Sequence, residues 1–343
     1  RRLEIFKSVL AESRELPNEF IEDMIMKAPS HNIMNKLSRS VLALYSYDEN
    51  PDDISIENVL RQSIQLLAQV PMIMSYAYQV KRRNFYHESM YLHPVDKTLS
   101  TAESVLYSIR ADKKFTPEEA HMLDICLMLH AEHGGGNNST FATRVLTSSG
   151  TDTYSAIAAG IGSLKGPKHG GANIKVMEMM DDIRAHVSDV TDEDEMRAYI
   201  GKIVDKEAFD HKGLVYGMGH AVYSLSDPRA VVFKSFVQQL AMAKGRKADF
   251  DFYNTVERLA PQVIAEKRHI YKGVSTNVDF YSGFVYNMLG IPVELYTPMF
   301  AVARVVGWSA HRMEELVNVD KIIRPAYKSV MATRDYLPME NRG

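Results

Sequence analysis

The sequence has one cysteine, Cys126, among its 343 residues. A single cysteine cannot form an internal disulfide, and this one sits in the apolar run 125–129. That pattern is typical of a protein kept in a reducing compartment, so we expect a cytoplasmic location. A membrane-spanning helix needs an apolar run of about 18 residues or more. No apolar run of that length occurs, so we do not expect a membrane protein.

A surplus of charge of one sign is also missing. The 40 lysines and arginines nearly balance the 43 aspartates and glutamates, for a net charge of −3. Domains that bind nucleic acid usually carry a basic surplus, so we expect no nucleic-acid partner. The length predicts a globular protein of about two domains with a large core. The chain begins with Arg1, without an initiator methionine or a signal peptide, so we expect it to start inside a longer natural chain.

Signals for β-strands are scarce, whereas signals for helices dominate. Segment 116–136 reads TPEEAHMLDICLMLHAEHGGG. Thr116 is typical of a helix N-cap, Pro117 suits the first helical position, and Glu119 completes a capping box. The largely apolar residues that follow predict a buried helix that stops at the glycines 134–136.

Two further segments have the apolar spacing of amphipathic helices. The first, within 171–187, places its stripe at Val176, Met180, Ile183 and Val187. The second begins with Asp227 and Pro228 and places its stripe at Val232, Phe236 and Leu240.

Helix ends are also marked near the end of the chain. One segment ends at Gly290 with Pro292 just beyond it, and the next starts with Thr297 and Pro298. In the middle third, we expect the acidic stretch 189–195 to be a solvated connection and the polar stretch 243–251 to belong to a smaller inserted domain. We predict an all-α fold.

Two histidines stand near the expected end of the buried helix. His130 and His133 have i, i+3 spacing, which predicts that both lie on one face of its last turn. The negative end of the helix dipole favours the imidazolium form there, so the pair suits an anion. The pair is equally consistent with simple stabilisation of the dipole. Zinc ligation is a third interpretation, but no Asp, Glu or Cys follows at ligand spacing.

Two other histidines are framed by glycine. His169 lies in GSLKGPKHGGAN, residues 162–173, and His220 follows Gly217 and Gly219 in GLVYGMGHAVY. Glycines let the backbone turn tightly and let another molecule come close, so both imidazoles are candidates for an exposed site. A lone histidine in a glycine-rich turn is more often a plain loop residue, but two such histidines are harder to explain that way.

Two arginines stand in unusual surroundings. Arg229 occupies the first turn of the helix that Asp227 starts, where a cation opposes the helix dipole and a bound anion would compensate. Arg304 is the only charge in MFAVARVVGW. A guanidinium buried without a partner is costly, so it needs a carboxylate from the protein or from a ligand.

Asp279 follows a Ser-Thr-Asn cluster at an apparent helix start. A first-turn aspartate is ordinary helix stabilisation. The functional alternative is a general base whose apolar neighbours Val278, Phe280 and Tyr281 desolvate it and raise its pKa. Spacing alone does not choose between the two.

Five segments occur in the order and approximate spacing of citrate synthases: LHAEHGGGNNSTFATRV, SSGTDTYSAIAAGIGSLKGPKHGGAN, YGMGHAVYSLSDPRA, NVDFYSGFVYNMLGIP and FAVARVVGWSAHRMEE. The sequence resembles that family over nearly its whole length. The resemblance implies an all-helical homodimer. It implies a large domain, 1–176 and 284–343, for dimerisation and oxaloacetate, and a small domain, 177–283, that binds coenzyme A and closes over the site. One departure is STNVD, where many relatives have proline before the asparagine, and it concerns the stiffness of the loop.

The resemblance also implies which residues carry the reaction. The catalytic trio is His169, His220 and Asp279. The oxaloacetate ligands are His133, His220, Arg229 and Arg304, with Arg324 supplied by the partner subunit. The expected coenzyme A contacts are Leu214, Val215, Tyr216, Gly217, Met218, Gly219, Lys272 and Asn277, with Lys165 as a further candidate for its phosphates.

The implied activity is a Claisen condensation of acetyl-CoA, or alternatively propionyl-CoA, with oxaloacetate, followed by hydrolysis of the thioester. Asp279 is then the base, His169 the donor to the thioester oxygen, and His220 the donor to the ketone oxygen. We expect no metal and no resident cofactor, since acetyl-CoA is a substrate. Two alternatives remain open. One is a metal-dependent hydrolase that uses His130, His133 and His169, and the other is a non-catalytic helical scaffold.

Overall fold

The computed structural model describes residues 1–219, 226–269, 273–318 and 321–342. In these residues the chain is helical and contains no β-strand, apart from an isolated bridge between Met218 and Thr276. The α-helices of the first half are α1 Arg2–Glu12, α2 Ile33–Ala43, α3 Ile56–Phe85, α4 Thr101–Ile109, α5 Pro117–His130, α6 Asn138–Ser148 and α7 Thr153–Leu164. Those of the second half are α8 Ala172–His186, α9 Glu193–Val204, α10 Pro228–Ala243, α11 Lys247–Arg268, α12 Asp279–Met288 and α13 Tyr296–Asn318. The predicted all-α fold is confirmed.

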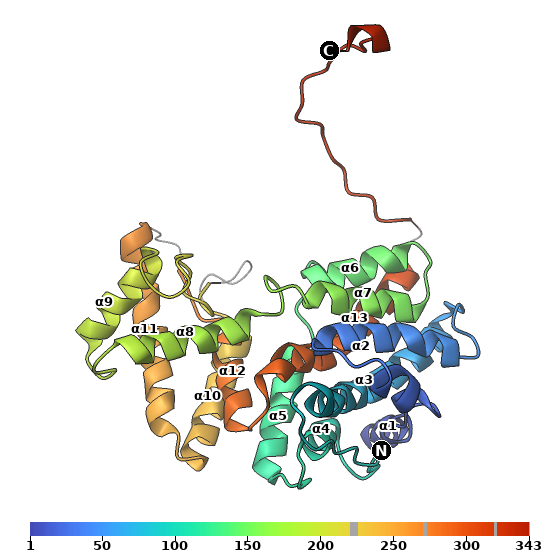
Figure 1. Cartoon of the computed structure of the whole chain (residues 1–343), viewed down its shortest axis with the longest axis horizontal. Coiled ribbons are helices and arrows are strands. Elements are labelled where there is room, and N and C mark those ends of the chain that lie inside the picture. The colour runs from blue at the N-terminus through green and yellow to red at the C-terminus, as the bar shows by residue number, and fades with distance from the viewer. Residues whose placement is uncertain (220–225, 270–272, 319–320, 343) are drawn as a thin grey trace.

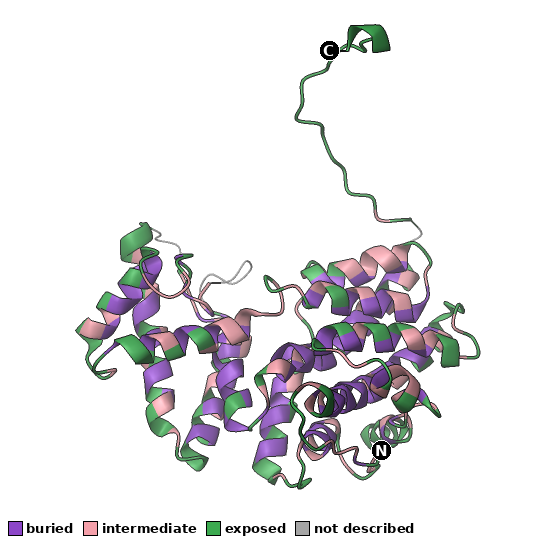
Figure 2. Cartoon of the chain, viewed as in Figure 1, coloured by how far each residue is buried: buried purple, intermediate pink, exposed green. Residues whose placement is uncertain are grey.

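The helices form two groups (Figure 1). Helices α8 to α12 lie on the left of the view, where α12 packs on α8 and α10 and α9 packs on α11. The other helices lie on the right, where α13 contacts α3, α5, α6 and α7. Helix α5 touches both groups, because it packs against α10 as well as α13. The buried surfaces face the inside of each group (Figure 2).

Helix α5 starts as the sequence predicts but ends earlier. Thr116 and Glu119 form the capping box, and Pro117 is the first helical residue. Cys126 is fully buried, as expected. The last helical residue is His130, and the chain turns away before the glycines. The prediction that His133 shares the last turn with His130 is therefore wrong, because the helix ends at its own C-cap, Ala131.

Helix α8 buries Val176, Met180 and Ile183, as its stripe predicts. Helix α10 starts at Asp227 and Pro228 as expected and buries Leu240 as predicted, but Val232 and Phe236 are not among its buried residues. Its buried residues are Ala230, Phe233, Val237, Leu240 and Ala241. Val232 is 50% exposed, and Phe236 is only partly buried. The segment has adjacent apolar residues at 231–233, so two helical stripes fit the same periodicity. Packing against α12, α5 and α11 decides between them.

Smaller differences concern helix boundaries. Helix α9 begins at Glu193 with Asp192 as its N-cap, so only the first part of the acidic stretch 189–195 is a connection. Helix α12 ends just before Gly290 as predicted, and α13 begins one residue before Thr297.

The end of the chain leaves the helical body. Residues 321–342 run as an extended tail that is almost entirely exposed (Figure 2). A hydrogen bond of 3.0 Å from the Ile323 N–H to Ser148 Oγ ties its start to α6. In the parts of the chain that the structure describes, no helix is long and apolar enough to cross a membrane.

Candidate active site

His169 lies in the turn between α7 and α8, held against the N-terminus of α6. The turn packs tightly because a Cβ at Gly170 would lie 2.2 Å from the Leu164 carbonyl oxygen. Ser139, in the first turn of α6, brings two groups to the imidazole. Its backbone N–H donates to Nε2 of His169 over 3.3 Å, and its Oγ lies 2.9 Å from the same nitrogen.

These contacts determine the protonation of His169. Because a backbone N–H can only donate, Nε2 is the acceptor and the neutral ring carries its proton on Nδ1. Burial lowers the pKa of His169, and the Arg304 cation lowers it further. A neutral imidazole with its proton on Nδ1 is suited to donate a hydrogen bond to a carbonyl oxygen.

Ser139 also links His169 to Arg304. Its Oγ accepts a hydrogen bond from Trp308 Nε1 over 3.2 Å and lies 3.0 Å from Asn137 Oδ1. Asn137 Oδ1 in turn accepts from Arg304 Nη1 over 3.2 Å. The sequence analysis did not identify Asn137, Ser139 or Trp308. The signal available was the polar run after the glycines, 137–140, at the start of a helix.

Arg304 is completely buried in α13. Its Nε donates to the His130 carbonyl oxygen over 2.7 Å, and its guanidinium lies 4.6 Å from the centre of the Phe300 ring. Burial lowers its pKa to about 10, so it stays charged at neutral pH. Its Nη2 is buried without a hydrogen-bond partner in the described residues. Leaving a charged donor unpaired is costly, so this nitrogen is suited to an anionic ligand.

His130 is fully buried at the end of α5. Its Nδ1 lies 2.8 Å from the Cys126 carbonyl oxygen and donates to it, while Nε2 has no partner among the described residues. Burial lowers its pKa to about 3, and the nearby cations Arg304 and Arg229 contribute. The predicted imidazolium form is therefore wrong, because desolvation and two positive neighbours outweigh the helix dipole. His133 lies partly buried just beyond the helix, where its N–H donates to Glu132 Oε1 over 2.8 Å.

Arg229, in the first turn of α10, is paired within its own segment. Its Nε and Nη2 donate to the two carboxylate oxygens of Asp227 over 3.1 and 2.8 Å. The sequence analysis identified Asp227 only as the N-cap of this helix. The signal for the pair was the spacing of two residues between a cap aspartate and an arginine.

Asp279 is the first residue of α12, and its N–H donates to Asn277 Oδ1 over 3.0 Å. Its neighbours Val278, Phe280 and Tyr281 are buried, as expected. Burial raises the pKa of Asp279 to about 6, although the cations Arg229 and Arg304 act in the opposite direction. The predicted direction of this shift is confirmed, and a carboxyl group with such a pKa is suited to act as a general base.

The predicted coenzyme A loop lies next to Asp279. Gly219 N–H donates to the Ser275 carbonyl oxygen over 2.7 Å, and Asn277 N–H donates to that of Gly217 over 2.9 Å. Gly217 has a φ of +78°, and a Cβ there would lie 2.8 Å from the Phe280 ring, so only glycine fits. The structure thus joins the loop 214–219 to Asn277 and the start of α12.

The remaining predicted site residues have varied surroundings, and two of them lie outside the described residues. Within 214–219, Val215 is buried, Leu214 is exposed and Tyr216 donates to Asp210 Oδ2 over 2.6 Å. Lys165 is exposed at the end of α7. His220 and Lys272 lie outside the described residues.

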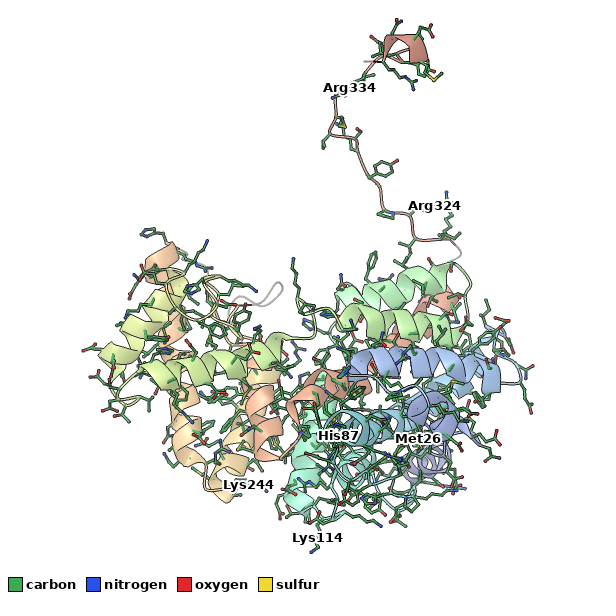
Figure 3. All side chains as sticks on the ribbon, in the orientation of Figure 1. Met26, His87, Lys114, Lys244, Arg324 and Arg334 are labelled. Carbon is green, nitrogen blue, oxygen red and sulfur yellow. The ribbon has the colours of Figure 1, made fainter. Side chains whose placement is uncertain are left out.

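Arg324 does not lie with His169, Arg229, Asp279 and Arg304, which form a cluster within the single chain. It projects from the start of the exposed tail (Figure 3). A metal site is not formed either. Among the residues described, no group of three or more His, Cys, Asp or Glu side chains could hold a metal ion. The described structure therefore gives no support to the hydrolase alternative with His130, His133 and His169.

The cluster thus combines a desolvated carboxyl group, a neutral imidazole and two arginines, from segments with the predicted motifs. A family model described as citrate synthase, C-terminal domain, matches residues 1–326. The chain belongs to the citrate synthase family.

Known relatives and a solved structure agree with this membership. The citrate synthase of Synechocystis sp. is 36% identical over 280 residues, which cover 81% of this chain and 64% of that relative. The 2-methylcitrate synthase 2 of Corynebacterium glutamicum is 34% identical over 83% of this chain and 69% of its own length. The ternary complex of carboxymethyl coenzyme A and oxaloacetate with citrate synthase from the archaeon Thermoplasma acidophilum matches with a TM-score of 0.78 and 26% identity, covering 99% of this chain and 84% of that one.

Proposed function

We propose that this chain condenses an acyl-CoA, either acetyl-CoA or propionyl-CoA, with oxaloacetate and then hydrolyses the thioester to release citrate or 2-methylcitrate and coenzyme A. The observation that carries the proposal is the placement of Arg304, which is linked to His169 through Asn137 and Ser139 and whose charge lowers the pKa of both His169 and Asp279. A base and a hydrogen-bond donor therefore lie near one anion-binding group, as an enolising condensation requires.

The condensation uses the two groups together. The Asp279 carboxylate removes a proton from the carbon next to the thioester carbonyl, while Nδ1–H of His169 donates to the oxygen on which negative charge develops. The enol carbon then attacks the ketone carbon of oxaloacetate, and the ketone oxygen takes a proton from His220. Water finally cleaves the citryl thioester and releases the coenzyme A thiol.

Oxaloacetate is a dianion, and arginine offers a planar fork for each carboxylate. In our proposal Arg304, through its unpaired Nη2, and Arg229 bind these carboxylates together with His133 and His220. Arg324 comes from the partner subunit of a homodimer. Its tail carries exposed apolar side chains, among them Tyr327, Val330 and Tyr336 at 95%, 100% and 81% exposure. Such side chains favour a covering partner, which supports the dimer.

We further propose that the helix group α8 to α12 belongs to a small domain, 177–283, which binds coenzyme A and closes on the large domain, 1–176 and 284–343. The loop 214–219 with Asn277 and Lys272 is its coenzyme A surface. Closure excludes water until condensation is complete. The lone buried Cys126 favours a reducing compartment, and on that basis we propose a cytoplasmic location.

The test is release of free thiol from acetyl-CoA and propionyl-CoA, each with and without oxaloacetate. We expect release that depends on oxaloacetate, and the preferred acyl donor is the one with the higher kcat/KM. His169→Ala should also abolish the oxaloacetate-dependent exchange of the acetyl methyl protons with solvent. Thiol release without oxaloacetate, at an equal rate, would contradict the condensation and favour a simple thioesterase.

A further inference from the structure

Asp227 does more than begin a helix. Its Oδ1 accepts a hydrogen bond of 3.0 Å from the Arg229 N–H, which is the N-cap interaction of α10. The same carboxylate receives Nε and Nη2 of Arg229. Its side chain is 0% exposed, whereas that of Arg229 is 16% exposed. The carboxylate is thus inside the protein, and the arginine reaches outward from it.

The pair occupies one edge of the guanidinium. Arginine has five N–H groups in a fixed plane, and Asp227 takes the edge formed by Nε and Nη2. Nη1 takes no part in this pair. A second carboxylate can therefore bind at the edge formed by Nη1 and Nη2 while Asp227 keeps its place. A guanidinium held on one edge has lost its side-chain freedom before the ligand arrives, so binding costs less entropy.

The N-cap role of Asp227 does not by itself require an ion pair with an arginine. Asp192 caps α9 by accepting from the N–H groups of Asp194 and Glu195 and takes no arginine, and it is exposed. Burial of an ionised carboxylate is costly without a charged partner. The buried position of Asp227 is stabilised by Arg229, and in return Arg229 is held in one orientation.

Asp227 also belongs to the charge balance of the site. The charged groups that face Asp279 in the described structure are Arg229 and Asp227 from α10 and Arg304 from α13. Tyr286 of its own helix, fully buried and neutral, is a further titratable neighbour. Burial raises the pKa of Asp279, the two arginines lower it, and Asp227 raises it.

We infer that Asp227 is a positioning residue for the proposed condensation, because its carboxylate holds Arg229 by one edge and presents the other edge to a substrate carboxylate. The inference rests on the proposed function. It assigns Asp227 no contact with the reacting atoms. It acts through Arg229, so the effect of replacing Asp227 on kcat/KM must depend on whether Arg229 is present.

The test is a double-mutant cycle on kcat/KM for oxaloacetate. Asp227→Asn keeps a good N-cap but removes the charge, and should lower kcat/KM about tenfold because Arg229 loses its orientation. In the Arg229→Ala background, the buried Asp227 carboxylate keeps its negative charge without Arg229 and repels the dianion. There Asp227→Asn should raise kcat/KM, by about threefold or more. If Asp227 were merely structural, Asp227→Asn would not lower kcat/KM in one background and raise it in the other.

Two further measurements complete the design. Asp192→Asn is the matched control, because Asp192 is an N-cap aspartate in the same helix group but does not bind an arginine. It should leave kcat/KM for oxaloacetate within about twofold of wild type. In Asp227→Asn, the acid limb of the pH profile of kcat/KM should shift to lower pH, because a negative neighbour of Asp279 is lost. Should Asp227→Asn fail to fold, Asp227→Ser supplies a cap without charge and serves in its place.

The possible results distinguish failure of the proposed condensation from failure of the positioning role of Asp227. An inactive wild-type chain would refute the proposed function, and the cycle is then judged on oxaloacetate binding by calorimetry, where the same reversal is expected. An active wild type with equal losses for Asp227→Asn in both backgrounds, or with an unshifted acid limb, would overturn the inference alone.

Discussion

At the scale of single residues, desolvation shifts the pKa values of imidazole and carboxyl groups in opposite directions. His130 and His169 both have a pKa below the usual range, because both are desolvated near Arg304. Asp279 has a pKa above the usual range for the same first reason. Desolvation disfavours whichever form is charged, so it keeps the imidazoles neutral and makes the carboxylate a stronger base. The same physical cause therefore favours both a neutral donor and a base.

Asp279 permits a prediction on activity and pH. A base acts only when ionised, so kcat/KM should fall as the pH drops below about 6 and level off above it. Asp279→Asn should lose at least about a hundredfold in kcat while still binding oxaloacetate. Rates from pH 4.5 to 8.5 and calorimetric titration with oxaloacetate check both points. Near-normal turnover of the variant would remove Asp279 from the mechanism.

The same residue has a consequence for stability. Its folded pKa is higher than its unfolded one, so the folded state binds the proton more tightly. The stability that Asp279 contributes is therefore present at low pH and is lost as the pH rises through about 4 to 6. At neutral pH, Asp279→Asn should consequently melt no lower than wild type, in contrast to its loss of activity.

At the scale of helices, the starts and ends follow local rules, whereas the buried face does not. The capping box of α5 and the Asp-Pro start of α10 stand where the sequence predicts. The buried face of α10 shares Leu240 with the predicted stripe but includes Phe233 and Val237 in place of Val232 and Phe236, because residues 231–233 offer apolar side chains on several faces. Helix ends depend on a few neighbouring residues, whereas burial depends on what packs against the helix.

The corrected face of α10 gives a second prediction. Phe233 is completely buried, whereas Val232 is half exposed. Phe233→Ala should lower the free energy of unfolding by about 3 to 5 kcal/mol because it removes a large side chain from the core. Val232→Ala should change it by about 0.5 kcal/mol or less. Urea denaturation followed by circular dichroism makes the comparison. A larger loss for Val232→Ala would restore the face expected from the sequence.

At the scale of the whole molecule, the site depends on how the helix groups meet. His169 and Arg304 belong to segments around α6, α7 and α13, whereas Asp227, Arg229 and Asp279 belong to α10 and α12. The two groups are joined at the far end of α5 by the ion pairs of Glu119 with Arg110, over 2.7 Å, and with Lys244.

The proposed dimer gives a third prediction, on Arg304 and Arg324. In the proposed dimer, Arg304 would serve its own chain and Arg324 the partner subunit, so the homodimers of Arg304→Ala and Arg324→Ala should each be almost inactive. In a heterodimer of the two variants, one site lacks both arginines and the other keeps both. Refolding an equal mixture should therefore restore roughly a quarter of wild-type activity, since about half the dimers are mixed.

The control for this experiment is each variant refolded alone, which should stay inactive. Differently tagged chains show whether mixed dimers form. Mixed dimers without recovered activity would mean that both arginines serve the same chain, and the shared site would be wrong.

The helix boundaries, the fold class and the family follow from local sequence patterns and from their order along the chain. The helix caps, the lone charge in α13 and the glycine-framed His169 are local patterns, and their combination in one order predicts the family and the fold. Such signals are readable because a capping hydrogen bond or a tight turn involves residues only two to four positions apart.

The tertiary structure alone decided the remaining features. The Arg304 guanidinium meets the His130 carbonyl oxygen and Asn137 across separations of 174 and 167 residues. The neutral state of His130 results from burial and from the cations Arg304 and Arg229, which no spacing along the chain encodes. For Asp279 the sequence left two alternatives open, and burial in the folded protein is what raises its pKa. The face of α10 was decided in the same way, by packing against α12, α5 and α11. Desolvation and Coulomb interactions act through space, so they are determined only when distant segments are brought together.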